Sequence, residues 1–333
     1  MTRTGSSHRE GVRAVLRAVR LLSGSAFELG GQRVDVLDPT TPLPQARVTL
    51  LGQHLYQQAY AHRPGSVPPA GHPPGADLGP TLSEANPTRE RWEGGWQVTQ
   101  VLPGGQVLAQ RLGQGRRLNP GSFLTHDGPG VPPRVGMTVS VFSPRESVSA
   151  QPGFYFAFGE EPLDPDEQDR LLRLYWNVRA GGAATLLREL GGALNRYQIP
   201  FQFKCLMYEG HYTRLDAAVL YIDQRHAHLT TELALDLHPR LAGHLDPEVP
   251  LFTRPLAPGL ALAEDPGNGD SFGMHRCARL AEGLWSAHER GVQDEEGRLR
   301  EVERAFAAHG LSLDRPELRA GSPRLAAPEV TYA

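Results

Sequence analysis

Cysteine is scarce in this chain, with 2 among 333 residues, Cys205 and Cys277. Two thiols cannot build a disulfide framework, and no CxxC pair is present for zinc binding or thiol exchange. Long apolar runs are also absent, because no stretch of about 18 apolar residues occurs. The arginines from Arg3 to Arg17 are not accompanied by the apolar core of a signal peptide. These absences predict a cytoplasmic protein that does not span a membrane.

The chain has no excess of charge of either sign. Its formal net charge is -3, which gives no general attraction to nucleic acid or to anionic lipid. Apolar residues make up 39% and charged residues 21%, which is typical of a globular protein of one large or two smaller domains. The 37 glycines and 29 prolines require many turns and loops, so a pure helical bundle is excluded.

Motifs of nucleotide-dependent and metal-dependent enzymes are missing too. The sequence has no GxxxxGK[ST] phosphate loop, no GxGxxG in a dinucleotide-binding context and no HExxH. We therefore expect no cofactor and no metal. Any anion site must be built locally from arginines and backbone donors.

Lysine is the rarest basic residue, since 33 of the 34 basic residues are arginines and the exception is Lys204. Coding bias explains arginine at exposed positions. It does not explain the exception. Arginine stays protonated at any workable pH, whereas a buried lysine beside cations can release its proton and act as a base.

The chain divides into three predicted parts. Residues 1–62 form a helical N-terminal part, with amphipathic helices over 10–22 and 48–61, and 63–85 form a linker or loop rich in proline and glycine. Residues 86–333 form an α+β domain, in which 90–160 is rich in strands and 154–310 is the candidate core. The predicted fold class is therefore α+β, with a mixed or antiparallel sheet packed against helices.

Within the core region the pattern alternates between helix and strand. The capping sequence Asp164-Pro165-Asp166-Glu167 predicts a helix that continues through Leu171 and Val178. Further helices are predicted over 182–197, 274–290 and 295–308. Two strands, FQFKCLMY from Phe201 and YTRLDAAVLYID from Tyr212, form a predicted hairpin.

The hairpin places polar side chains on one face. Lys204 shares a face with Gln202, and a turn near Glu209 sets Lys204 opposite Arg214. A nearby guanidinium and partial burial both favour a neutral amine, which suits a general base. In the alternative interpretation, Lys204 extends to solvent at a sheet edge and Arg214 pairs with Asp216.

A second group of polar residues lies in SFGMHRCARL, from Ser271 to Leu280. Ser271 is the predicted N-cap of a helix, with His275 and Arg276 in its first turn. Backbone donors at a helix N-terminus beside such side chains form a candidate phosphate cradle. In the alternative, both side chains point to solvent. Further arginines that can point inward are Arg254, which precedes a proline, and Arg173 and Arg179, on the helix capped by Asp164.

Several blocks of the sequence together resemble the HopA1-type effector family. They are FYFAFG, RLYWN, ALNRYQIPFQFKCL, YTRLDAAVLYI, TRPLAPGLALAEDP and SFGMHRC, spread over residues 154–280. The resemblance implies an activity, because similar proteins in bacterial peptide-modification clusters of the lanthipeptide and thioamitide type act as lyases on phosphoserine or phosphothreonine. Their substrate is a ribosomal precursor peptide, and a separate kinase-like protein acts beside them.

Eliminating phosphate needs a base for the Cα proton, cations for the phosphate and a proton donor. The sequence offers Lys204 as the base and His275 or Tyr212 as the acid. The candidate phosphate and substrate ligands are Arg214 with its neighbour Asp216, Arg276, Arg254 and Arg179. The alternative function is a non-catalytic, effector-like module that binds a peptide or a protein. In both cases we expect no nucleic acid and no membrane as partner.

Overall fold

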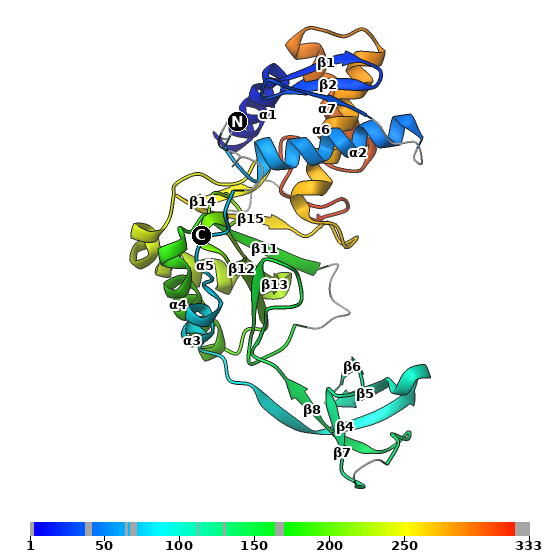
Figure 1. Ribbon diagram of the computed structural model, residues 1–333, viewed down its shortest axis with the longest axis vertical. Coiled ribbons are helices and arrows are strands. Elements are labelled where there is room, and N and C mark those ends of the chain that lie inside the picture. Colours follow the sequence, from blue (N-terminus) through cyan, green and yellow to red (C-terminus); the bar gives the residue numbers. More distant parts are fainter. Residues whose placement is uncertain are drawn as a thin grey trace.

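The computed structural model describes residues 3–36, 42–63, 66, 72–111, 113–128, 131–163 and 170–323. Helices and three antiparallel sheets alternate along this part of the chain (Figure 1). The predicted α+β class is confirmed. Short 3-10 turns join several elements: η2 (Pro103–Gly105), η4 (Ala180–Gly182), η5 (Glu209–His211), η6 (Gln224–His226) and η7 (Ala242–His244).

A seven-stranded sheet forms the centre of the molecule, in the order β14-β15-β11-β13-β12-β10-β9. Every neighbouring pair is antiparallel. Because side chains alternate along a strand, each strand sends one set of residues to each face of the sheet. The strands are β9 (Glu146–Ser147), β10 (Phe154–Phe158), β11 (Leu171–Trp176), β12 (Phe201–Leu206), β13 (Ala218–Asp223), β14 (Arg254–Ala257) and β15 (Leu260–Glu264).

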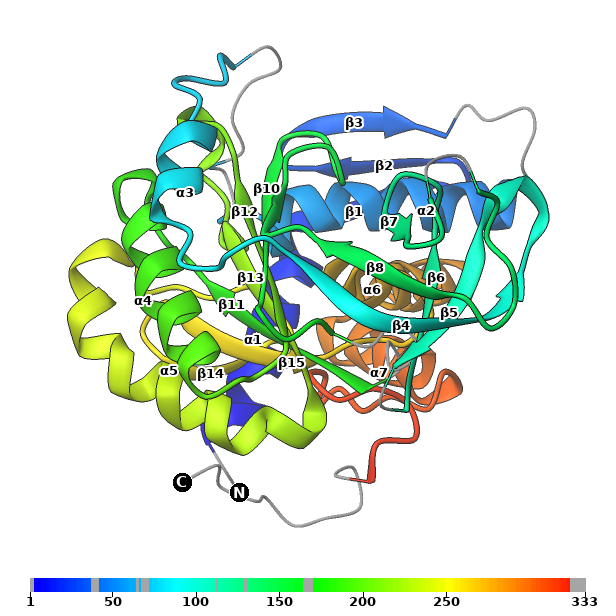
Figure 2. The same cartoon turned by 90° about the horizontal axis from the view of Figure 1, so that it is seen from below.

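Three helices cover one face of this sheet (Figure 2). They are α3 (Gly79–Ala85), α4 (Ala183–Arg196) and α5 (Ala227–Leu241). Leu186 and Leu190 of α4 pack with Trp176, Phe203 and Leu220 of the sheet in one buried cluster. The helices and this face of the sheet together form an apolar core.

The opposite face is only partly covered, by α6 (Phe272–Glu289) and the elements that pack on it. Tyr175 and Val219 of the sheet join Phe272 in a second buried cluster. The remaining elements on this side are α1 (Arg3–Ala18), β1 (Val19–Ser23), β2 (Ala26–Leu29), β3 (Gln32–Asp35), α2 (Leu43–Leu55), the π-helical turn η1 (Tyr56–Tyr60) and α7 (Glu295–Ala308).

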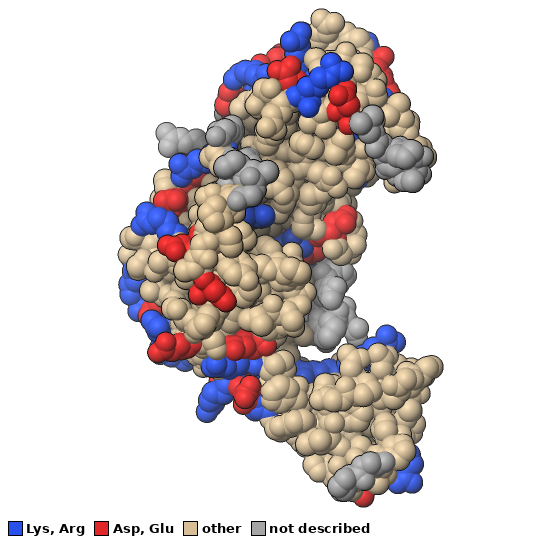
Figure 3. All heavy atoms as spheres, viewed as in Figure 1, with Lys and Arg blue, Asp and Glu red and all other residues tan. Residues whose placement is uncertain are grey.

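A five-stranded sheet projects from the rest of the molecule (Figure 1). Its order is β6-β5-β4-β8-β7, and Trp96, Val107 and Val139 lie in its own buried cluster. Figure 3 shows the surface hollowed between this sheet and the helical end of the molecule. The strands are β4 (Arg91–Val101), β5 (Val107–Arg111), β6 (Gln114–Leu118), β7 (Phe123–Thr125) and β8 (Thr138–Ser143).

Several predicted elements occur where the sequence placed them. The helices predicted over 182–197, 274–290 and 295–308 are α4, α6 and α7, and FQFKCLMY contains β12. The helix predicted over 48–61 is α2, which starts earlier and continues into η1. The short helix α3 lies inside the segment predicted as a linker. The N-terminal helices do not stand apart, since α2 packs directly on α6: a Cβ at Gly52 would lie 3.3 Å from the Ala278 backbone.

Two helix predictions are wrong. Leu171–Trp176 is strand β11, paired with β13 on one side and β15 on the other. Its residues are nearly all buried, and such an apolar run fits a central strand as well as a helix. The predicted cap at 164–167 lies outside the described residues. The first helix ends at Ala18, where the chain enters β1 of a three-stranded sheet that the helical pattern did not predict.

The predicted register of the hairpin is also wrong. Lys204 pairs with Val219, not with Arg214, because β13 begins only at Ala218. The intervening chain turns through η5 and leaves the sheet, and the Leu215 N–H donates to the Ala61 carbonyl. Arg214 therefore lies on a connection beside the sheet.

Candidate functional site

A pocket of about 300 Å³ opens on the partly covered face of the seven-stranded sheet, and we call it the Lys204 pocket. Its floor is the sheet, one wall is η1, and another wall is the start of α6. It unites segments that lie far apart in the sequence. The lining residues are Tyr56, Tyr60, Gln151, Phe154, Arg173, Tyr175, Lys204, Arg214, Asp216, Val219, Tyr221, Ser271, Phe272, Gly273 and Met274.

Lys204 reaches the pocket because its strand alternates. Phe203 and Cys205 point into the apolar core, so Lys204 points to the opposite face. Its Nζ donates to Oε1 of Gln151 at 2.7 Å and lies 4.0 Å from the centre of the Phe154 ring. The pKa of Lys204 is lowered to about 8, mainly by burial; Asp216 opposes the shift, and Arg214 and Arg173 contribute to it.

Arg173 lies on the same face, on the neighbouring part of the sheet. It is buried, its Nε donates to Oδ2 of Asp265 at 2.7 Å, and its Nη2 donates to the Asp270 carbonyl at 3.1 Å. The guanidinium lies over the ring of Tyr221, 5.3 Å from its centre. These contacts hold the positive charge in a fixed orientation at the pocket wall.

Arg214 supplies a second fixed guanidinium. Its Nε and Nη2 donate to the two carboxylate oxygens of Asp216 at 2.8 and 2.9 Å, and its Nη2 also donates to the Tyr56 hydroxyl at 2.7 Å. Burial of Asp216 opposes its ionisation, but the pKa of its carboxyl is held below the ordinary value mainly by Arg214. Asp216 is therefore an ionised anchor for Arg214.

The N-terminus of α6 completes the pocket. The Ser271 hydroxyl accepts from the Met274 N–H at 3.3 Å, which confirms Ser271 as the N-cap. Phe272 and Gly273 line the pocket, so the N-terminal turn of α6, which is the positive end of its dipole, borders it. A Cβ at Gly273 would lie 2.4 Å from the Tyr60 ring, so only glycine allows this wall to close.

The pocket thus presents two anchored guanidiniums, one amine and a helix N-terminus to whatever enters it. This is the arrangement that binds a phosphoryl group. Of the residues singled out from the sequence, Lys204, Arg214 and Asp216 are brought together here, with Arg173. Arg173 comes from strand β11, not from the predicted helix.

Arg276 and His275 lie elsewhere. Arg276 is fully buried and donates to the carbonyls of Pro316 and Leu318 at 2.7 and 2.8 Å, so it fastens the C-terminal segment to α6. His275 faces a different pocket, between α2 and α6. Burial, assisted by Arg276, lowers the pKa of His275 to about 4, so its imidazole is neutral near pH 7.

The three remaining candidates are also outside the Lys204 pocket. The Tyr212 hydroxyl donates to the Leu206 carbonyl at 2.6 Å, and burial raises its pKa. Arg179 is exposed at the surface and pairs with Asp246 at 3.3 Å. Arg254 lies on the edge strand β14, where it acts electrostatically on Glu317. None of the three lines the Lys204 pocket.

Several pocket residues were not found from the sequence. Tyr56, Tyr60 and Gln151 come from segments without local signals of chemistry, and only the packing of η1 and of the β9–β10 loop brings them to the sheet. Tyr175 and Tyr221 lie on the same face of their strands as the pocket, and their neighbours along the strands, such as Leu174 and Leu220, point into the apolar core on the other face. Recognising Leu171–Trp176 as a strand would have put Arg173 and Tyr175 on the face of Lys204.

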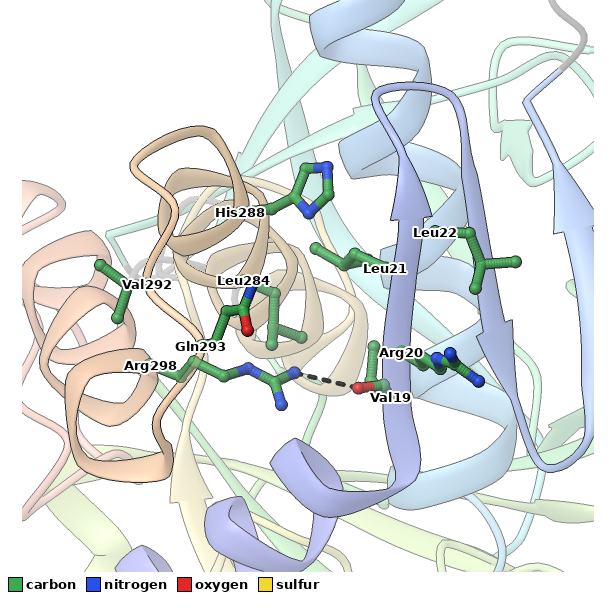
Figure 4. A pocket seen from close by; sticks show the side chains of 9 residues that line it. All are labelled: Val19, Arg20, Leu21, Leu22, Leu284, His288, Val292, Gln293 and Arg298. Carbon is green, nitrogen blue, oxygen red and sulfur yellow. Dashed lines mark hydrogen bonds between the residues drawn. The ribbon is translucent and has the colours of Figure 1, made fainter.

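A separate pocket, of about 470 Å³, lies away from the Lys204 pocket, between β1 and the turn that joins α6 to α7 (Figure 4). Its most prominent cation, Arg298, donates to the carbonyls of Leu16 and Val19 at 2.6 and 3.0 Å. The Leu16 carbonyl lies in the last turn of α1 and Val19 is the first residue of β1, so Arg298 binds where the helix ends and the strand begins. The guanidinium is engaged in structure, and this pocket is not the candidate site.

Comparison with known proteins identifies the family of this chain. The chain belongs to the HopA1 effector protein family, whose model matches residues 145–318, and the resemblance seen in the sequence is confirmed. The fold is shared with the solved structure of the effector protein from Pseudomonas syringae pv. tomato strain DC3000, at 18% identity and a TM-score of 0.50, over 95% of this chain and 97% of that one. The structure of the effector protein from Pseudomonas syringae pv. syringae strain 61 matches over 83% and 97%, at 16% identity and a TM-score of 0.42.

No curated protein matches the chain. None of the helices in the described ranges has both the length and the hydropathy that crossing a bilayer requires.

Proposed function

We propose that this protein is a carbon–oxygen lyase that eliminates phosphate from phosphothreonine or phosphoserine in a ribosomal precursor peptide. The observation that supports it most is the position of the only lysine of the chain, in a pocket with two arginines that are each held by a carboxylate. The family resemblance implies the same reaction. A cytoplasmic setting and a separate kinase-like protein that makes the phosphopeptide complete the proposal.

The phosphoryl group of the substrate is placed between Arg173, Arg214 and the N-terminus of α6. Each arginine is oriented before the substrate arrives, so little side-chain freedom is lost on binding. Each carboxylate neutralises only part of the positive field, because the amine and the helix end add to it. The two guanidiniums and their two carboxylates cancel in formal charge, so the protonated amine and the helix N-terminus supply the net positive charge that attracts a phosphate monoester, and the guanidiniums supply oriented N–H donors.

Lys204 takes the Cα proton in the proposed step. With a pKa of about 8, roughly a tenth of the amine is neutral at pH 7, whereas the fraction is far smaller for an ordinary lysine. The neutral amine donates one N–H to Gln151 and keeps its lone pair for the proton. The electrons of the Cα–H bond form the Cα=Cβ double bond, and the Cβ–O bond breaks toward the phosphate.

A dianionic monoester would release PO4³⁻, so the leaving phosphate needs a proton as the Cβ–O bond breaks, and the two guanidiniums stabilise the charge that develops on it. The ammonium that Lys204 forms by taking the Cα proton is the acid that can return this proton, so that hydrogen phosphate leaves and the neutral amine is restored. The sequence-based assignment of His275 or Tyr212 as the acid has no support from their positions. The products are inorganic phosphate and dehydrobutyrine or dehydroalanine, and no water is consumed.

The test is to incubate the protein with a phosphothreonine peptide and measure the mass of the product. Elimination gives a peptide one water lighter than the unphosphorylated peptide. Return to the mass of the unphosphorylated peptide would mean hydrolysis and would refute the proposal.

Lys204→Arg separates catalysis from binding. Arginine keeps the charge but cannot act as a base, so we expect elimination to fall by at least about 100-fold while phosphopeptide binding persists. If wild type binds the phosphopeptide tightly but releases no phosphate, the alternative function, a non-catalytic peptide-binding module, is favoured.

A further inference from the structure

A second pocket of about 300 Å³ adjoins the Lys204 pocket, and we call it the Gln202 pocket. The two share Gln151, Arg173, Lys204 and Tyr221 as a common wall. The amine of Lys204 is thus accessible from both sides. A ligand whose reacting carbon lies at Lys204 can occupy both pockets at once.

The chemistry of the two pockets differs. Arg214 and the start of α6 line only the Lys204 pocket, so the anion belongs there. The Gln202 pocket adds no cation beyond the shared ones and is lined by Phe156, Leu163 and Leu171 together with the amide of Gln202. One pocket holds about ten water volumes, which is more than a phosphoryl group and its side chain fill. The second pocket is therefore available to another part of the substrate.

Gln202 has the polar group that a peptide backbone requires. It lies on β12, two residues before Lys204 on the same face, and it is half-buried. No described residue hydrogen-bonds its amide. An amide offers one acceptor and two donors, which match the N–H and C=O of a peptide group. Two residues of strand span about 7 Å, the reach of about two residues of an extended peptide.

The rim of the Gln202 pocket is built from glycines. Gly267 and Gly269, both at positive φ, lie on the loop from β15 to α6. The Gly267 N–H donates to Oδ1 of Asp265 at 2.9 Å, and Asp265 also holds Arg173. The loop is therefore fixed to the phosphate-binding arginine, and a main chain can approach it closely because no side chains stand in the way.

From this arrangement we infer that the Gln202 pocket binds the peptide backbone beside the phosphorylated residue, with the Gln202 amide hydrogen-bonded to a peptide group one or two residues away. The inference rests on the proposed function and adds the subsite for the chain. Gln202 is a positioning residue that makes the protein selective for a residue within a peptide over an isolated phosphorylated residue.

The experiment compares two substrates in two variants. The substrates are acetylated and amidated Ala-Ala-phosphothreonine-Ala-Ala and N-acetyl-phosphothreonine methylamide. The variants are Gln202→Leu, which removes the amide at similar volume, and Gln110→Leu, the same change at an exposed position of β5. We expect Q202L to lower kcat/KM for the pentapeptide about ten-fold through KM, to leave the single residue unchanged, and Q110L to change neither.

Peptides that carry a single backbone N-methyl group locate the contact. Methylation at the contacted peptide group weakens wild type but not Q202L, because the hydrogen bond is already lost in that variant. Equal losses on both substrates in Q202L, or no loss on the pentapeptide, would overturn the inference.

Failure of the proposed function is recognised separately, because then neither substrate loses phosphate with wild type. The same comparison is then read from dissociation constants of the two phosphorylated compounds. A Q202L loss confined to the pentapeptide supports the subsite, and equal affinities in wild type and Q202L overturn it.

Discussion

Replacing Lys204 by methionine tests whether the amine is buried at an energetic cost. The ordinary pKa of lysine is 10.5 and that of Lys204 is about 8, mainly because of burial. One pKa unit corresponds to 1.36 kcal/mol, so holding the charged form in the folded protein costs about 3 kcal/mol at neutral pH. Methionine has a similar shape and no charge, and it removes this cost.

The gain is reduced by contacts that methionine cannot make. The hydrogen bond to Gln151 and the position over the Phe154 ring contribute about 1 kcal/mol each. We therefore expect Lys204→Met to be about 1 kcal/mol more stable than wild type at pH 7. Urea denaturation measures the difference, provided that the m-values of the two proteins agree.

The pH dependence makes the test sharper. Between about pH 8 and pH 10.5 the unfolded chain keeps the lysine proton that the folded protein has released, so wild type gains stability as pH rises. The advantage of Lys204→Met should shrink across this range and reverse near its upper end, where only the lost contacts remain. The stability of Lys204→Arg should not rise with pH in this way, because arginine stays charged in both the folded and the unfolded state.

The pKa of Lys204 can be measured directly by NMR. Because the chain contains a single lysine, protein labelled with ¹³C at lysine gives one set of side-chain NMR signals, whose titration reports this amine alone. A midpoint near 10.5, or a Lys204→Met variant that is less stable than wild type at every pH, would refute the reasoning.

Three further predictions follow from the same contacts. Arg214→Lys removes the two-pronged bond to Asp216, so KM for a phosphothreonine peptide should rise about ten-fold or more with a smaller change in kcat, and a loss confined to kcat would contradict the clamp role. The kcat/KM for elimination should rise with pH and level off above about pH 8, because Lys204 of the free enzyme loses its proton in this range. A kcat/KM that falls over this range would exclude an amine base. Gly273→Ala forces a Cβ against the Tyr60 ring and should destabilise the fold by about 1–3 kcal/mol. The control is Gly192→Ala in α4, where a Cβ meets open space and the change should be neutral or stabilising. Thermal melting curves of the two variants provide the comparison.

The sequence carried enough information to select Lys204 and its direction. Its rarity marked it, and alternation along FQFKCLMY placed it opposite the buried Phe203 and Cys205, as the structure has it. The position of the neighbouring cation, Arg214, was harder to predict. The predicted pairing with Arg214 assumed a tight turn, but the chain leaves the sheet through η5. Arg214 lines the same pocket as Lys204 because its side chain is bound to Asp216 and to the Tyr56 hydroxyl.

Other parts of the site depended on contacts remote in sequence. The cap at Ser271 was predicted from local rules, yet these rules cannot say which side of α6 faces the sheet. Arg276 turned out to bind carbonyls of 316–318, a segment with no local signal of that role. In β11, a capping pattern and a helical spacing competed with an apolar run, and pairing with two neighbouring strands decided for the strand.

The arginines in the pocket reduce an apparent conflict in the proposed chemistry. A phosphate that lay against Lys204 would raise the pKa of the amine and weaken the base when it is needed. Arg173 and Arg214 stay protonated and lower the pKa of Lys204, which offsets part of the effect of the phosphate, while Asp265 and Asp216 keep both guanidiniums in place. The amine can then remain largely desolvated between phosphate and peptide. A pocket with one base and two permanently charged phosphate ligands requires one lysine among arginines, because only lysine can give up its proton.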